Sequence, residues 1–195
     1  MFGKNPVLKK EKGADGKMLR VVKGSPFYTL QGEGPFAGHP AVFIRLHGCN
    51  LRCWFCDTEF SDPDDPHYPI EALVDECLKH PTRLVVLTGG EPLRQNVVPL
   101  VGLLLANGFT VQFETSGTVW WEELAQFDRQ NVHYIVSPKT GKVNDEVSKR
   151  AMAYKYIIDA TDGGIGDDGL PISSTQVQGT ECTIAKPTDR DWDTI

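Results

Sequence analysis

The chain has 195 residues, which is most simply one domain with room for a sizeable core. Hydrophobic residues make up 40% of it, yet no apolar run approaches the ~20 residues needed to cross a bilayer, so no membrane partner is expected. The formal net charge of −6 argues against broad nucleic-acid binding. Five cysteines, an odd number, in a chain whose N-terminus lacks a signal-like apolar stretch predict a cytoplasmic protein without a disulfide framework.

Residues 1–24 are predicted to form a basic N-terminal arm. This stretch holds seven lysines and arginines but only two acidic residues. A charged terminal segment of this kind is most simply solvated and partly disordered. Residues 25–195 would then form a single core domain.

Strands and helices alternate along the rest of the chain. Short β-branched or apolar runs predict strands at 41–47, 84–87, 109–113, 132–136 and 154–158. Apolar residues at helical spacing, or helix start and stop residues, predict helices at 69–80, 96–108, 119–127 and 145–153. This order indicates an α/β fold with a mostly parallel sheet. Beyond residue 159 the sequence is rich in Gly, Asp, Pro and Thr and shows little periodicity.

The unusual polar clusters each come directly after a predicted strand. They are HGCNLRC at 47–53, TGGEP at 88–92, ETSG at 114–117 and SPK at 137–139. Parallel α/β folds carry their sites at the carboxyl ends of the strands. The clusters are therefore expected to converge on one rim of the sheet.

The first of these clusters contains Cys49, Cys53 and, three residues further on, Cys56, in the spacing C-x3-C-x2-C. Three thiolates in a short loop suit a [4Fe–4S] cluster with one iron left open to a ligand. A structural zinc ion is the alternative, with His47 as a fourth ligand. Unligated thiols are the third possibility. Cys77, on the apolar stripe of its helix, is expected to pack in the core.

Three further positions have both a plain and a functional interpretation. Glu91 is either a solvated turn residue or an acceptor for a cationic amino group. Arg45 interrupts an apolar strand and is expected to be buried, where it needs an anionic partner: it forms either a structural salt bridge or a clamp on a substrate carboxylate. Thr58 is either a turn residue or a neutral ligand of Mg²⁺.

The segment QGEG at 31–34 is either a glycine turn or a place where the backbone approaches a planar ligand. In the second case the Gln31 amide and the Glu33 carboxylate would match the donor–acceptor edge of a pterin or purine.

The cysteine spacing, with Phe55 before the last cysteine and TGGEP further on, resembles the radical S-adenosylmethionine (SAM) superfamily. The stretch from about Phe27 to Asp159, which includes QGEG, CDT, LTGGEPL, FETSGT, VSPK and YKYIID, is similar to one family in it, the 7-carboxy-7-deazaguanine synthases. This resemblance implies an abbreviated radical SAM partial (β/α) barrel. It also implies conversion of 6-carboxy-5,6,7,8-tetrahydropterin with loss of ammonia, on the route to deazapurines and queuosine. A 5′-deoxyadenosyl radical, released from SAM by the reduced cluster, would remove hydrogen from C6.

The resemblance also assigns roles to individual residues. Cys49, Cys53 and Cys56 would hold the cluster, and Thr58 would bind Mg²⁺. The residues expected at the SAM site are Phe55, Asp57, Gly90, Glu91, Glu114, Ser116, Ser137, Pro138 and Lys139. Those expected to contact the pterin are Leu30, Gln31, Gly32, Glu33, Arg45 and Thr88.

The family further implies a homodimer and a reductant such as flavodoxin. The chain ends at Ile195, where the family normally begins another strand, so the C-terminal part of the core domain is expected to be truncated. Two alternative functions stay open from sequence: a radical SAM activase that acts on a partner protein, and a zinc-stabilised module without enzymatic activity.

Overall fold

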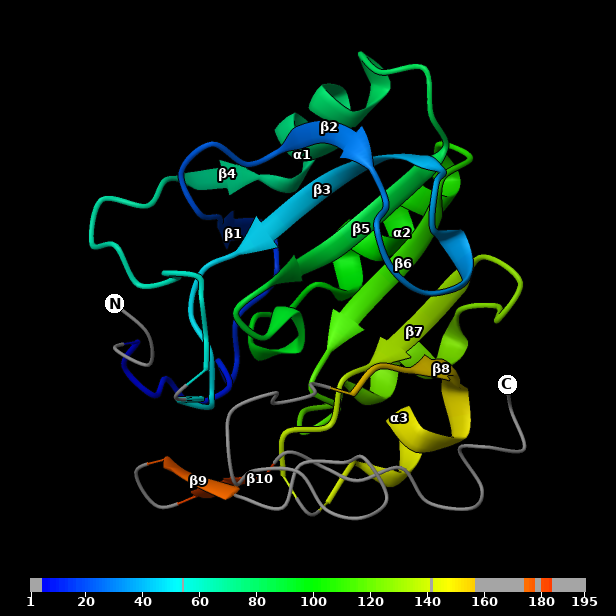
Figure 1. Cartoon of the computed structure of the whole chain (residues 1–195). Helices are drawn as coiled ribbons and strands as arrows, with labels where there is room; N and C mark the ends of the chain where they lie inside the picture. The colour runs from blue at the N-terminus through cyan, green and yellow to red at the C-terminus, as the bar shows by residue number, and fades with distance from the viewer. Residues whose placement is uncertain (1–4, 54, 141, 157–173, 178–179, 184–195) are drawn as a thin grey trace.

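A six-stranded sheet forms the centre of the computed structural model, which describes residues 5–53, 55–140, 142–156, 174–177 and 180–183 (Figure 1). The strand order is β2-β3-β5-β6-β7-β8. All neighbours from β3 to β8 pair in parallel, and β2 lies antiparallel to β3 at the edge. The predicted α/β class with a mostly parallel sheet is confirmed. The strands are β2 (Phe27–Leu30), β3 (Pro40–Leu46), β5 (Leu84–Gly89), β6 (Thr110–Thr115), β7 (Val132–Val136) and β8 (Ala151–Tyr154).

Two small antiparallel pairs lie outside this sheet. Strand β1 (Met18–Arg20) pairs with β4 (His67–Pro69), and β9 (Ser174–Val177) pairs with β10 (Thr180–Thr183).

Three α-helices pack against the sheet: α1 (Ile70–Leu78), α2 (Val98–Ala106) and α3 (Asp145–Arg150). Leu73 of α1 and Leu100 of α2 share the main core cluster with Val85 and Phe113 of the sheet, and none of the four is exposed. Burial of such side chains stabilises the fold by about 1.5–3 kcal/mol each. In the described ranges, no helix is both long enough and apolar enough to span a membrane.

The helices α1 and α2 agree with the predicted apolar stripes, with small differences. Cys77 is completely buried, as expected, whereas Leu78 at the end of α1 is 44% exposed. Helix α2 begins two residues after Asn96, whose side-chain oxygen accepts a hydrogen bond from the Val98 amide at 3.2 Å. Gly108 follows the helix with a φ of +76°, as its predicted role as a stop requires.

Three predicted elements are wrong in type or position. The helix expected at 119–127 is only a 3-10 helix, η3 (Glu122–Gln126). The preceding Trp121 stays extended because its buried ring donates a hydrogen bond from Nε1 to the Leu93 carbonyl at 2.7 Å, so packing overrides helical spacing. The helix expected at 145–153 ends at Arg150. The strand expected at 154–158 is β8, the last strand of the six-stranded sheet, and it runs from Ala151 to Tyr154. Residues 157 and 158 lie outside the described part of the chain.

The segment after β2 crosses the face of the sheet opposite the main core (Figure 1). It contains the short 3-10 helix η1 (Gly34–Phe36). The Phe36 ring lies 5.0 Å from the His133 ring of β7. The QGEG segment therefore lies in the loop that joins β2 to β3, which a backbone hydrogen bond between Gln31 and His39 closes at its base, and this loop reaches as far as β7.

The N-terminal segment is packed onto the domain over its described residues, 5–24, which differs from the expected solvated arm. Leu19 and Val21 belong to the main core, and their exposed fractions are 1% and 0%. The Arg94 side chain, itself buried, forms an ion pair with Glu11 at 2.9 Å. The basic composition of the segment did not reveal this packing, because among its described residues it is Leu19 and Val21 that belong to the main core cluster.

We expect Leu19→Ala to lower the free energy of unfolding by about 2–5 kcal/mol, because it leaves a cavity in the main core. Met18→Ala, at the neighbouring position where the side chain is 52% exposed, should change it by less than about 0.5 kcal/mol. Urea unfolding of both variants measures the difference. Equal, small effects would show that residues 5–24 do not contribute to the core.

Candidate active site

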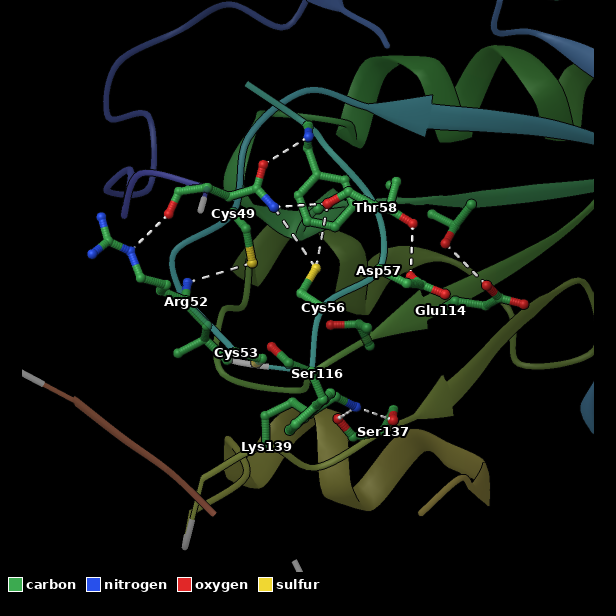
Figure 2. A pocket seen from close by; sticks show the side chains of 18 of the residues that line it. Cys49, Arg52, Cys53, Cys56, Asp57, Thr58, Glu114, Ser116, Ser137 and Lys139 are labelled. Carbon is green, nitrogen blue, oxygen red and sulfur yellow. Dashed lines mark hydrogen bonds between the residues drawn. The ribbon is translucent and has the colours of Figure 1, made fainter. Parts of the chain in front are cut away.

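A single pocket of about 300 Å³ gathers the ends of four neighbouring strands, β3, β5, β6 and β7 (Figure 2). The expected convergence on one rim is therefore confirmed. Twelve of the residues singled out from sequence line it: Cys49, Cys53, Phe55, Cys56, Asp57, Thr58, Thr88, Gly90, Glu114, Ser116, Ser137 and Lys139.

Seven singled-out residues do not line this pocket: Leu30, Gln31, Gly32, Glu33, Arg45, Glu91 and Pro138. The expectation that Arg45 is buried is wrong. It is exposed, and its guanidinium carbon lies 5.2 Å from the centre of the Phe27 ring. No ion pair of the described residues includes Arg45, so the structural salt bridge is not formed there.

The QGEG segment reaches the pocket through its side chains. Gln31, which is 2% exposed, donates a hydrogen bond from Nε2 to Glu114 Oε1 at 3.0 Å. Thr88 donates from Oγ1 to the other oxygen of Glu114 at 2.9 Å. Glu33 forms an ion pair with Lys155, which lines the pocket. The segment that follows edge strand β2 is thus joined to β6 and to the chain just after β8, and through Glu114 also to β5.

Seven lining residues were not singled out from sequence: Asn5, Leu51, Arg52, Phe60, Gly89, Thr115 and Lys155. Most of them lie between or beside residues of the motifs, so their position next to these motifs could have identified them from sequence. Asn5 had none, because it comes from the segment interpreted as a solvated arm.

The two glycines of TGGEP allow close contact between two pieces of backbone. A Cβ atom on Gly90 would lie 2.0 Å from the Gly48 carbonyl oxygen, and one on Gly89 would lie 2.3 Å from that of Leu46. Gly89 also has a φ of +116°, a conformation that favours glycine. The glycines therefore seat the end of β5 against the start of the cysteine loop.

Glu91 is the residue that holds this rim together. Its carboxylate is 0% exposed and accepts four hydrogen bonds: from Thr115 Oγ1 at 2.7 Å, Ser116 N at 2.9 Å, Ser116 Oγ at 2.6 Å and Leu93 N at 3.1 Å. Burial raises the pKa of this carboxyl, and the hydrogen bonds oppose the rise. A carboxylate offers about four acceptor positions, and all are occupied by protein donors. The solvated turn residue, one of the two alternatives from sequence, is therefore wrong, whereas contact between Glu91 and the amino group of SAM stays a prediction.

The three cysteines of the loop are thiols rather than disulfides, and all line the pocket. Burial, followed by the nearby Glu91 charge, raises the pKa of Cys49 to about 12. Burial also raises the pKa of Cys56. Such thiols are deprotonated when a cationic metal centre compensates the thiolate charge.

The cysteine loop fits a multi-iron cluster better than zinc. In the described part of the chain, no three His, Cys, Asp or Glu side chains converge closely enough to hold one metal ion. Three free thiols in one pocket match the three protein ligands of a cluster with one open iron, whereas a structural zinc ion requires four ligands. His47, the expected fourth zinc ligand, is buried against Asp65, with Nδ1 2.7 Å from the carboxylate, and it does not line the pocket.

Comparison with known proteins agrees with this geometry. Residues 43–162 match the model of the radical SAM superfamily. The 7-carboxy-7-deazaguanine synthase of Rhodospirillum rubrum is 46% identical over 96% of this chain and 77% of its own length. The chain belongs to the 7-carboxy-7-deazaguanine synthase family. A further synthase of that name, from Rickettsia prowazekii, is 41% identical over 81% of this chain and 69% of its own length.

A solved structure shows that the fold is shared with the 7-carboxy-7-deazaguanine synthases. The crystal structure of QueE from Escherichia coli matches with a TM-score of 0.57 and 32% identity, covering 70% of this chain and 69% of that one. The radical SAM architecture inferred from the motifs is thereby confirmed.

We expect Glu91→Gln to lower the free energy of unfolding by about 1–3 kcal/mol, because an amide nitrogen cannot accept from the buried donors of Ser116. Glu122→Gln, at an exposed position of η3, is the matched control and should change it by less than about 0.5 kcal/mol. Chemical unfolding of both variants measures this. A Glu91→Gln variant as stable as the control would contradict the structural role of the carboxylate.

Proposed function

We propose that this pocket catalyses the reaction of the 7-carboxy-7-deazaguanine synthases, in which 6-carboxy-5,6,7,8-tetrahydropterin becomes 7-carboxy-7-deazaguanine and ammonia leaves. One observation carries the proposal: the three loop cysteines share a single pocket with polar side chains from the ends of β5, β6 and β7. The curated relatives named above favour this reaction over a protein-directed activase or a zinc-stabilised module.

Membership of the radical SAM superfamily implies a [4Fe–4S] cluster and SAM. In our proposal Cys49, Cys53 and Cys56 hold the cluster and leave one iron for SAM. Bound together there, cluster and SAM would supply a 5′-deoxyadenosyl radical, the group that would take hydrogen from C6 of the pterin. A carbon radical attacks almost any nearby C–H bond, so the protein must fix the target atom close to it and keep other groups away.

The SAM side of the pocket is assigned to the ends of β6 and β7. Ser116 and Ser137 are short hydroxyl residues suited to ribose, and Lys139 offers a cation to a carboxylate. The ammonium of Lys139 donates to the Ser137 carbonyl at 3.0 Å, which keeps this turn closed. The Gly90 backbone lines the same pocket and provides close approach without a side chain.

The pterin side is assigned to Thr88 and Glu114, which line the pocket, although the sequence resemblance placed Glu114 at the SAM site. Gln31 lies behind them and acts through its hydrogen bond to Glu114. Glu114 accepts one hydrogen bond at each oxygen, so each oxygen retains an acceptor position for a ligand donor. The amino and ring N–H groups of a pterin are such donors. Leu30, Gly32, Glu33 and Arg45 stay predictions as substrate contacts, because none of them lines the pocket.

A magnesium site is proposed at Thr58. Its hydroxyl lies 2.9 Å from Asp57 Oδ1, and both residues line the pocket. A hydroxyl and a carboxylate are oxygen donors of the kind that Mg²⁺ binds, usually together with water or substrate oxygens. The substrate carboxylate would complete such a site.

Several expectations stay predictions: the homodimer, the flavodoxin-type reductant, the cytoplasmic location, and the extent of a single core domain over 25–195. The relatives cited here extend beyond the part that this chain covers. Contacts that the additional residues of these relatives make are not attributed to this chain.

The reaction is tested by anaerobic reconstitution with iron and sulfide, followed by SAM, a reductant, Mg²⁺ and the carboxy-tetrahydropterin. Mass spectrometry should show a product lighter by ammonia. Changing any one of Cys49, Cys53 and Cys56 to Ala should abolish both the iron–sulfur absorbance and the product. Cys77→Ala, in the core, should retain both. SAM cleavage by the wild-type protein without the lighter product would refute the assigned reaction.

The magnesium site is tested by Thr58→Ala. Loss of one ligand should raise the Mg²⁺ concentration needed for half-maximal activity about tenfold, while SAM cleavage without substrate stays unchanged. Thr140→Ala, outside the pocket, is the control. An unaltered Mg²⁺ titration of Thr58→Ala would remove this residue from the metal site.

A further inference from the structure

The N-terminal segment lies directly on the cysteine loop. Val7 forms a parallel bridge with Cys49, and the Leu8 amide donates to the Cys49 carbonyl at 2.7 Å. The Asn5 carbonyl accepts a hydrogen bond at 2.9 Å from Nε of Arg52, which lies between the first two cysteines. Residues far apart in sequence are thus joined around the loop (Figure 2).

The side chain of Asn5 reaches the third cysteine. It is buried, with 7% exposed, and Nδ2 donates to the Thr58 carbonyl at 2.7 Å and to Cys56 Sγ at 3.7 Å. Its Oδ1 accepts from the Phe60 amide at 2.9 Å and from the Ser61 hydroxyl at 3.3 Å.

These partners determine the orientation of the Asn5 amide. The Thr58 carbonyl can only accept a hydrogen bond and the Phe60 amide can only donate one, so Nδ2 must face Thr58 and Oδ1 must face Phe60. The second hydrogen of Nδ2 is then directed to the Cys56 sulfur.

We propose that Asn5 is a positioning residue of the cluster site: through its hydrogen bond to Cys56 Sγ it orients this ligand and raises the reduction potential of the cluster. The inference rests on the proposed function, because it takes Cys56 as a cluster ligand. In the metal-free chain Cys56 also donates to the Thr58 carbonyl at 3.4 Å, a bond that a thiolate loses. The donation from Asn5 remains possible after deprotonation and becomes charge-assisted.

The direction of the effect follows from charge. Reduction places an additional negative charge on the cluster and its sulfur ligands, and a donor N–H stabilises that charge. Hydrogen bonds to the sulfurs are among the features that set iron–sulfur potentials. Removal of the donor should therefore make the potential more negative.

The test compares the same chemical change at two asparagines that both anchor the N-terminal segment. Asn5→Asp keeps Oδ1 but replaces the donor with negative charge. Asn96→Asp is the control, because Asn96 Nδ2 donates to the Ala14 carbonyl at 2.9 Å and its Oδ1 accepts from the Val98 amide, so the Asn96 bonds to described residues do not involve a cysteine. Redox titration of the reconstituted proteins, followed by EPR of the reduced cluster, gives the potentials.

At the wild-type midpoint, the ratio of reduced to oxidised cluster should fall about tenfold in Asn5→Asp, which for a one-electron couple is about 59 mV. Asn5→Ala, which removes the donor without adding charge, should shift in the same direction by less. Asn96→Asp should match the wild type. Unshifted potentials in cluster-bearing Asn5 variants, even at lower cluster occupancy, would overturn the proposal.

Metal-free protein provides a second measurement if both Asn5 variants fail to hold a cluster. Alkylation of Cys56, followed by mass spectrometry, should be several-fold faster in these variants than in Asn96→Asp, because the loop has lost its anchor. Equal rates would overturn the proposal. Failure of the wild-type protein itself to bind a cluster would instead refute the proposed function, so the two failures are distinguishable.

Discussion

A buried carboxylate, Glu91, is the constraint on which the geometry of the pocket depends. Three accepted hydrogen bonds, from Thr115 and Ser116, join it to the end of β6, and the Leu93 amide donates the fourth within its own turn. The backbone amide of Glu91 donates to the Gly48 carbonyl at 3.0 Å. The cysteine loop, the β5 turn and the β6 turn are therefore held as one unit. A charge without solvent is tolerated at this position only because every acceptor position is occupied.

Glu91 and Glu114, the two glutamates of the rim, differ in how many of their carboxylate acceptor positions are occupied by protein donors. Glu91 has no acceptor position left, whereas Glu114 has one free on each oxygen and lines the pocket. Glu91 follows β5 and Glu114 is the second-last residue of the neighbouring strand β6. Their difference arises from depth: Glu91 points into the protein, towards Thr115 and Ser116, and Glu114 points towards the ligand space. Of the two, Glu114 is the carboxylate whose acceptor positions are open to a ligand in this arrangement.

Much of this arrangement was predictable, because strand order alone places the polar clusters on one rim and periodicity identifies α1 and α2. Features that depend on partners distant in sequence were not. The spacing of 119–127 favours a helix, but the Trp121 hydrogen bond to Leu93 prevents one. Arg45 was expected to be buried, but it lies on the face of β3 opposite Ile44 and Leu46, outside the main core, and its side chain is exposed over Phe27. In each case a local pattern was outweighed by a contact that the pattern does not contain.

The N-terminal segment shows the same limit at the site itself. Its lysines indicate a solvated segment. The overall composition does not reveal the few residues that contact the rest of the domain, which are Leu19 and Val21 in the core and Asn5 at the cysteine loop. A cluster loop is rich in ligands but poor in regular structure, so its own backbone provides little to orient three sulfurs. Hydrogen bonds from another segment can supply that order. Because Asn5 binds the chain both before Cys53 and after Cys56, it restricts the loop at two points with a single residue.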